Sequence, residues 1–521
     1  MIEASPPLES PEKSVPELTS RSAERTREPR FALVLVMFVL SGATGLIDQL
    51  CFSKYLGGIV GSTAYAVSAV LAAFMTGLAL GAHIGGRLSR RVTRPLRAYG
   101  GLELLVAATV ALTPAGFAAL EPVYIALVKL APHSVAWLSA ARWSLAMLLV
   151  VVPTMAMGAT LPILCAGLGP SAPLGDQDAG HSRERRLGRL YAANTLGGAV
   201  GALLAAYWIL PALGLSGTLF ASASLSATLG IAAIVASRSG VELGSAQAAR
   251  SAEPAAPAEG SAGAVSAVVP ARSEYLLLSG LAWASGALVF TAEVIFTHLL
   301  ALIIGNSVYA FGLILAIFLC CLFLGAAAVE RVKARWGTQA LTLSLAGTAL
   351  ALALTLPLWD QLPLLFNNTG EVLRSFEARE ATRAFCALFI LLVPTTLMGL
   401  TFPLLLQRVA KYAAVGALVG RLTAVNTLGA VLGSLAAGYW LLPALGSENA
   451  LLFVALCFGG LALTTAFVLG APRRQVAWVI GLALVAALAL PRWNLAKLTA
   501  GTNVYFSGAQ PADHILMLHE D

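Results

Sequence analysis

The chain has 521 residues, of which 58% are hydrophobic and only 11% are charged, and its mean hydropathy is +0.81. Soluble globular proteins carry about 25% charged residues, so the composition excludes that class and indicates a polytopic membrane protein. The formal net charge of +7 is better explained by loop arginines that set membrane orientation than by a nucleic-acid surface. We therefore expect the lipid bilayer as a partner and no nucleic acid.

Residues 1–30 are rich in Pro, Ser, Glu and Arg, a composition that predicts a disordered cytoplasmic tail. Apolar stretches long enough to cross a bilayer follow, and backbone groups in lipid must bond within their own segment. We therefore expect an all-α fold with about 13 transmembrane helices, since a span needs about 20 apolar residues. These helices should begin near residues 31, 63, 98, 139, 190, 215, 274, 307, 338, 382, 418, 448 and 475.

The stretch Ser41–Ala82 occurs twice in the chain. It aligns without a gap on Ser285–Ala326, and 16 of its 42 residues are identical. The motif from Pro153 to Pro162 likewise returns from Pro394 to Pro403. Such a duplication indicates two six-helix halves, 31–236 and 273–470, joined by a linker at 237–272. This is the parallel-repeat plan of the major facilitator transporters.

Basic residues gather in the loops that would share one side of the membrane, which predicts a multi-pass protein of the bacterial inner membrane with a cytoplasmic N-terminus. Residues 471–490 should form one extra helix. Residues 491–521 are more polar and contain two patterns that suit short strands, Asn503–Phe506 and Ile515–Leu518. The loop cations are Arg87, Arg90, Arg91, Arg94, Arg97, Arg183, Arg185, Arg186, Arg189, Arg331, Lys333, Arg335, Arg473 and Arg474.

Together the repeated motifs resemble the membrane half of the fused major facilitator/spermidine synthase-like proteins of bacteria. The resemblance implies an aminopropyltransferase-like domain after the helices, but 491–521 resembles only its first strands. With no Gly-x-Gly-x-x-Gly after a strand, the chain should not catalyse aminopropyl transfer itself. We expect that domain from a reading frame that continues past Asp521, or from a separate chain. The motifs are Gly61-Ser62-Thr63-Ala64-Tyr65-Ala66, Pro153-Thr154-Met155-Ala156-Met157-Gly158 and Tyr191-Ala192-Ala193-Asn194.

Ionisable groups inside predicted spans are the main candidates for function, because they are costly in lipid. The first helix carries Asp48 and Gln49, and its copy carries Glu293 at the position that matches Gln49. The fourth helix and its copy carry Arg142 and Arg383. One interpretation is a central cavity in which Asp48 and Glu293 bind a cation or proton and the arginines reset them. The alternative is a structural acid–arginine bridge in each half.

Three further positions stand out. Glu103, early in the third helix, either faces Arg142 or reaches the cytoplasmic interface. Asn194 and Asn426 are predicted in the first turns of their helices, where they precede small residues spaced four apart. This spacing lets two helices approach closely, so the amides either cap or cross-link a neighbouring helix or bind a ligand. The small residues are Gly197, Gly201, Gly429 and Gly433.

Two functions remain open from the sequence. The first is a transporter-like protein for a small polar or cationic solute, related to polyamines. The second is a membrane anchor or sensor for an aminopropyltransferase-like domain. No catalytic residue, metal site or cofactor is expected, because the sequence offers no nucleophile–base pair, phosphate loop or cluster of metal ligands.

Overall fold

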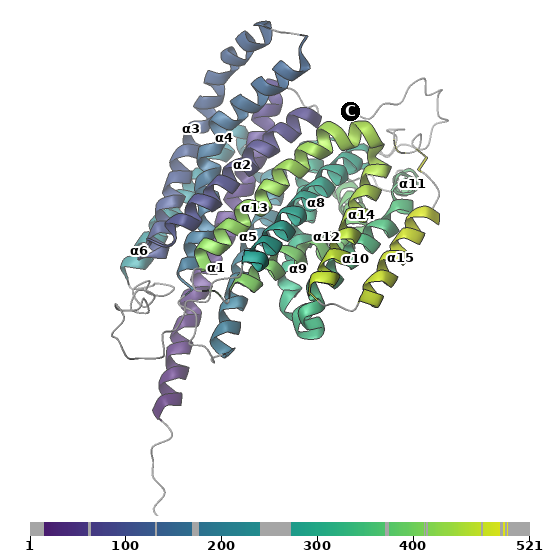
Figure 1. Ribbon diagram of the computed structural model, residues 1–521. Helices are drawn as coiled ribbons and strands as arrows, with labels where there is room; N and C mark the ends of the chain where they lie inside the picture. Colours follow the sequence, from purple (N-terminus) through teal and green to yellow (C-terminus); the bar gives the residue numbers. More distant parts are fainter. Residues whose placement is uncertain are drawn as a thin grey trace, which may run out of the picture.

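The computed structural model describes residues 15–60, 64–130, 133–168, 177–239, 272–369, 375–410, 412, 415–469, 473–489, 493–494 and 498. Over these ranges the chain forms helices and no strand, which confirms the predicted all-α class (Figure 1). Most of the predicted linker, at 240–271, and both predicted strand segments lie outside the described residues.

Six helices form the first group, which we call the N-terminal bundle. They are α1 (Val15–Val60), α2 (Ala64–Leu88), α3 (Pro95–Leu130), α4 (Val135–Ala166), α5 (Gln177–Leu204) and α6 (Leu210–Arg238). The C-terminal bundle contains α8 (Arg272–Ile304), α9 (Val308–Trp336), α10 (Ala340–Thr355), the short α11 (Leu362–Thr369), α12 (Phe376–Val409), α13 (Val415–Ala436) and α14 (Leu442–Leu469). The last helix, α15 (Arg473–Ala489), packs on α10 and α14.

The chain passes from α5 to α6, and from α13 to α14, through the same kind of turn. Each α-helix ends in five residues of π-helix, Ala205–Ile209 or Ala437–Leu441. A glycine with positive φ follows, Gly214 at 67° and Gly446 at 70°. Only glycine adopts this backbone conformation without strain, so the glycine of each repeated motif has a direct structural reason.

Nine helices of the described residues are long and apolar enough to cross a membrane. Three of them run through a junction and contain 57, 51 and 55 residues, whereas one crossing needs about 20. The chain is thus a multi-pass membrane protein. In α15 the apolar part is only Val476–Val485, so the count of thirteen spans stays a prediction.

Helix pairing is the same in both bundles. In the N-terminal bundle α1 packs on α5, α2 on α4 and α3 on α6; in the C-terminal bundle the equivalent pairs are α8 with α13, α9 with α12 and α10 with α14. The bundles meet along two seams, α2 with α13 and α5 with α9. These seams are equivalent under the repeat, so the halves face each other about an approximate two-fold axis. The proposed boundaries 31–236 and 273–470 stay a prediction.

Glycines hold the matching pairs close together. A side chain on Gly197 or Gly201 would collide with backbone of α1, and one on Gly429 or Gly433 with backbone of α8. Glycine here lets two backbones touch, as small-residue motifs do in membrane helices. The carbonyls that would be struck belong to Val39, Ala43, Trp283 and Ala287.

Two helices begin earlier than predicted. The helix α1 starts at Val15, inside the segment 1–30 expected to be disordered, and α5 starts at Gln177. Both early segments contain Glu, Arg and Ala, which favour helix but are too polar for lipid. Asn194 consequently lies well inside α5 and Asn426 well inside α13 (Val415–Ala436); the prediction that they occupy first turns is wrong.

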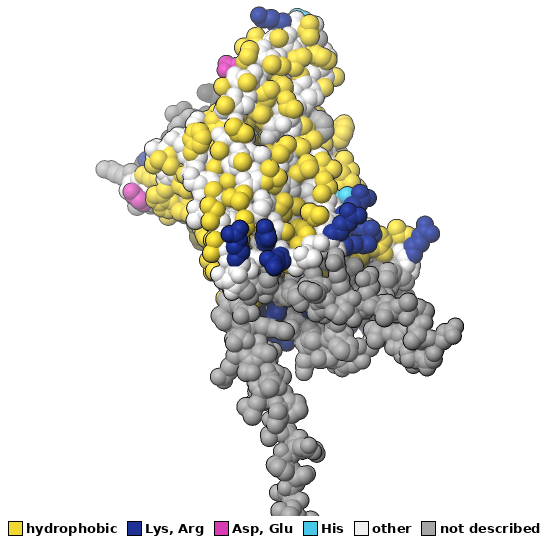
Figure 2. Space-filling model, turned by 90° about the vertical axis from the view of Figure 1, so that its left-hand side faces the viewer, with side chains coloured by type: hydrophobic (Ala, Val, Ile, Leu, Met, Phe, Trp, Pro, Cys, Tyr) yellow, Lys and Arg dark blue, Asp and Glu magenta, His cyan; other side chains and the backbone are white. Residues whose placement is uncertain are grey.

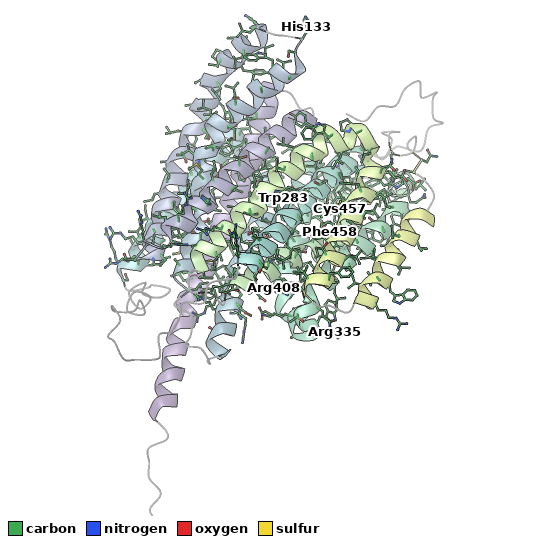
Figure 3. All side chains as sticks on the ribbon, in the orientation of Figure 1. His133, Trp283, Arg335, Arg408, Cys457 and Phe458 are labelled. Carbon is green, nitrogen blue, oxygen red and sulfur yellow. The ribbon has the colours of Figure 1, made fainter. Side chains whose placement is uncertain are left out.

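The surface divides into an apolar belt and a basic end. Large apolar side chains are exposed along the helices, among them Leu112 and Leu148, as lipid contact requires. Figure 2 shows Lys and Arg gathered along one edge of this belt, where Arg87, Arg90, Arg91, Arg94 and Arg97 are exposed. We call this the arginine-rich end. Arg335 also lies there, and His133 lies at the opposite end (Figure 3).

Candidate functional site

One face of each bundle packs against the other bundle. Leu46 of α1 packs against buried residues of α5 and α9, including Ala202 and Leu315. Phe290 of α8 packs against the core of the N-terminal bundle. Leu46 and Phe290 are equivalent positions of the repeat (46 + 244 = 290). They therefore mark the faces that α1 and α8 turn toward the opposite bundle.

Gln49 and Glu293 follow these two residues by three positions. Residues three apart lie on one face of a helix, so the carboxamide of Gln49 and the carboxylate of Glu293 share the faces marked by Leu46 and Phe290. Gln49 is 7% exposed, whereas Glu293 is intermediate in exposure. The structure thus sets a partly accessible acid on the face that α8 turns toward the N-terminal bundle.

Asn194 of α5 lies on the same inner side. Gly198, one turn further along α5, would meet the Leu46 side chain if it carried a Cβ. Asn194 is nevertheless exposed, and Asn426 of α13 is partly exposed. Their backbone carbonyls make the closest contacts, with Gly42 and Gly286 respectively, and the amide oxygen of Asn426 also lies close to Gly286. The two asparagines therefore lie on helix faces that also carry buried glycines.

The Asp48 side chain is directed into the N-terminal bundle, and the cavity that it was predicted to share with Glu293 stays a prediction. Its side chain is 0% exposed and lies near Ser222 of α6 and Glu103 of α3. A step of one residue turns the side chain by about 100° around the helix, which separates Asp48 from Gln49. The predicted pairing of Glu103 with Arg142 is not described either: Glu103 is 1% exposed and accepts a hydrogen bond from Ser41.

The structure describes a partner for one of the two arginines of the fourth helices. Arg383 forms an ion pair with Glu380, three residues earlier in α12. Glu380 also accepts a 2.5 Å hydrogen bond from Tyr207 of the N-terminal bundle. The side chain of Arg142 lies outside what the structure describes. Glu380 is not among the candidates that the sequence analysis singles out; its i,i+3 spacing to Arg383 was the available signal.

Contacts between the bundles occur at both ends. At the arginine-rich end Glu184 of α5 forms an ion pair with Lys333 of α9, and the Cα of Gly420 lies 3.0 Å from where a side chain on Gly86 would place its Cβ. At the opposite end the Tyr207 ring lies 5.4 Å from that of Tyr309, between centroids. Each end is therefore bridged by groups that can separate without breaking a helix.

Neither of two hollows on the described surface includes Gln49 or Glu293. The larger, of about 550 Å³, lies far from the arginine-rich end, and the smaller, of about 220 Å³, lies at that end. Lys54 lines the larger hollow, in keeping with a long cation at a helix end. Its other charged or hydroxylated neighbours are Tyr55, Glu121, Tyr124 and Lys129.

Fold and contacts together define a multi-pass membrane protein of two facing helical bundles. No protein-family model matches the chain, and no curated protein matches it. Several solved structures of transporters resemble the chain in fold.

The nucleoside transporter NupG is 13% identical with a TM-score of 0.49, over 85% of this chain and 99% of that one. The xylose symporter XylE is 12% identical with a TM-score of 0.49, over 85% and 96%. The E. coli fucose:proton symporter FucP is 14% identical with a TM-score of 0.45, over 84% and 98%. XylE and FucP are described as members of the major facilitator superfamily. Likeness of fold does not fix function, which has to be judged from this chain's own residues.

Proposed function

We propose that the protein transports a small polar or cationic solute across the membrane, bound between the two bundles. The observation that carries this proposal is the position of Glu293, one turn beyond Phe290 on the face that packs against the N-terminal bundle. A carboxylate in a membrane span is costly, and such groups mark substrate or ion pathways. Partial exposure of Glu293 lets a solute reach it.

The neighbouring side chains favour a hydrogen-bonding solute that carries positive charge. Gln49, Asn194 and Asn426 would supply amide donors and acceptors around the Glu293 carboxylate. Amines are suitable partners, because a protonated amine both donates hydrogen bonds and neutralises a carboxylate. The resemblance to spermidine synthase-like fusions makes a polyamine the first solute to test.

Movement would follow the approximate two-fold axis. In repeat-built transporters, one half rocks against the other around a site near the middle of the membrane. The seams of this protein suit such motion, since each end is held by a few contacts such as Glu184 with Lys333 and Tyr207 with Glu380. Breaking the contacts at one end of the seams while keeping those at the other end would open the protein to one side of the membrane.

The test is uptake of radiolabelled spermidine into proteoliposomes, with mannitol as a neutral comparison solute. We expect saturable uptake by the native chain and a loss of at least about tenfold in Glu293→Gln, equivalent to about 1.4 kcal/mol of binding. Glu293→Asp should retain part of the activity. The matched control is Glu377→Gln, which alters an exposed acid at the start of α12.

Equal uptake by Glu293→Gln and the native chain would contradict the proposed site. No uptake of spermidine or mannitol by well-folded native protein would count against these solutes. Aminopropyl transfer that appears when an aminopropyltransferase-like domain is added to the protein would then support the alternative role, a membrane anchor or sensor.

A further inference from the structure

A buried polar cluster lies inside the N-terminal bundle, away from the face between the bundles. Glu103 of α3 accepts a 2.5 Å hydrogen bond from Ser41 of α1. On α6, Ser226 donates to the Thr44 hydroxyl at 3.3 Å and Ser222 to the Thr44 carbonyl at 3.4 Å. We call these residues together with Asp48 the α1–α3–α6 cluster. It combines two carboxylates with hydroxyl groups from two helices.

Asp48 is the unusual member of the cluster. It is 0% exposed, and neither of its carboxylate oxygens makes a hydrogen bond of good geometry. Ser222 lies close enough to act on it as a donor, but its hydroxyl donates to the Thr44 carbonyl. Nearly all buried polar groups in proteins are hydrogen-bonded, and an isolated buried carboxylate is far more costly than an amide or hydroxyl. Two acceptor atoms that point into a buried polar cluster therefore call for a positively charged partner.

The surrounding side chains do not provide that partner. Glu103 acts on Asp48 with charge of the same sign. The other titratable groups that face the pair are Cys51 of α1 and Tyr99 of α3, and neither carries positive charge. Among the described residues that act on Asp48 or Glu103 there is no Lys, Arg or His.

The C-terminal bundle shows that the fold does not need this cluster. The repeat places Ala292 at the position of Asp48 (48 + 244 = 292), and Val454 and Phe458 at those of Ser222 and Ser226 (222 + 232 = 454; 226 + 232 = 458). All three are 0% exposed members of one hydrophobic core, and Phe458 is visible inside the bundle in Figure 3. The α10 segment, which pairs with α14 as α3 pairs with α6, contains no acid.

We propose that the α1–α3–α6 cluster is a binding site for one small monovalent cation, a proton or a sodium ion. Both are hard cations for which carboxylate and hydroxyl oxygens are suitable partners. A proton would reside on one carboxyl oxygen and remove one of the two negative charges of the pair. A sodium ion would take the same oxygens as ligands. The site differs from the proposed solute site at Glu293, and its occupancy can be tested without any assay of transport.

The experiment measures the thermal unfolding midpoint, Tm, of the full-length protein in detergent. In one arm NaCl replaces choline chloride at pH 8; in the other the pH falls from 9 to 5 in choline chloride. A cation that binds only the folded protein raises Tm as its concentration rises. We expect a rise in at least one arm, and that arm identifies the cation. Equilibrium binding of ²²Na⁺ provides a direct reading for sodium.

Asp48→Asn and Glu103→Gln should each weaken the dependence of Tm on the cation, and the double variant should abolish it. Glu293→Gln is the matched control: it should keep the dependence even where uptake is lost, so the two proposals fail separately. If Asp48→Asn does not fold, Glu103→Gln and Ser226→Ala test the same cluster. A native Tm that responds to neither cation, or a response that persists in Glu103→Gln and Ser226→Ala, would overturn the proposal.

Discussion

The two seams between the bundles occupy equivalent positions but use different chemistry. In the α2/α13 seam Gly86 meets Gly420, so backbone touches backbone. The repeat places Glu330 and Gly188 at the equivalent positions of the α5/α9 seam (86 + 244 = 330; 420 − 232 = 188). There Glu330 accepts a hydrogen bond from Gln407 of α12, in its own bundle, and the same amide nitrogen would lie 3.6 Å from a Cβ on Gly188 of the other bundle.

This difference in contacts indicates that the two seams contribute differently to the packing of the bundles. Contact between glycines depends on shape and tolerates no added atoms, so the α2/α13 seam sets how closely the bundles approach. The α5/α9 seam also carries the ion pair between Glu184 and Lys333. Beside this seam Tyr207, in the π-helical segment after α5, donates a hydrogen bond to Glu380 of α12. These polar contacts can separate and re-form. Substitutions should therefore act strongly and sterically at the first seam, and weakly and electrostatically at the second.

The largest effect is expected from Gly86→Leu. The added side chain would collide with the backbone of Gly420, and overpacking a tight contact destabilises by about 1–3 kcal/mol. We expect a clear drop in Tm in detergent. The control is Gly101→Leu, on an open face of α3 where an added Cβ meets nothing within 4 Å; there the gain in helix propensity should leave Tm unchanged or raise it. Equal effects at both glycines would refute a steric role for the seam.

A smaller effect is expected from Tyr207→Phe in the other seam. The change removes the hydrogen bond to Glu380 but keeps the ring that lies against Tyr309. A hydrogen bond to a charged group contributes about 1.5–3 kcal/mol, and Glu380 would keep its ion pair with Arg383, so the loss should be at the low end. Tyr309→Phe is the control. A Tm equal to that of the native chain would show that the hydrogen bond does not hold the bundles together.

The smallest effect is expected at Glu184 and Lys333. Their side chains are 21% and 36% exposed, and ion pairs at such sites contribute about 0.2–1 kcal/mol. Glu184→Lys should lower Tm slightly at low salt, and the added Lys333→Glu should restore it. A double-mutant cycle at low and high salt measures the coupling. Coupling that does not weaken with salt would show that the pair is buried in the membrane protein.

Much of the fold was visible in the sequence because duplication leaves a readable offset. Once Gly42 aligns with Gly286, the neighbours of α1 predict those of α8. The direction of single side chains was not visible. Asp48 and Gln49 are adjacent in the chain, and only packing of α1 against α3 and α6 decides which of them faces the other bundle. Glu380 was missed because its role depends on Tyr207, which lies in the other bundle and far away in the sequence.

The link between α5 and α6 has one more consequence. Because the chain turns through a π-helical segment and Gly214 with no intervening loop, α5 and α6 have no slack between them. Ala206 touches the α9 side of the seam at Gly312, while Ser222 and Ser226 of α6 face Asp48 and Thr44. A displacement of α5 along the seam would therefore also move the hydroxyl groups around the buried acid.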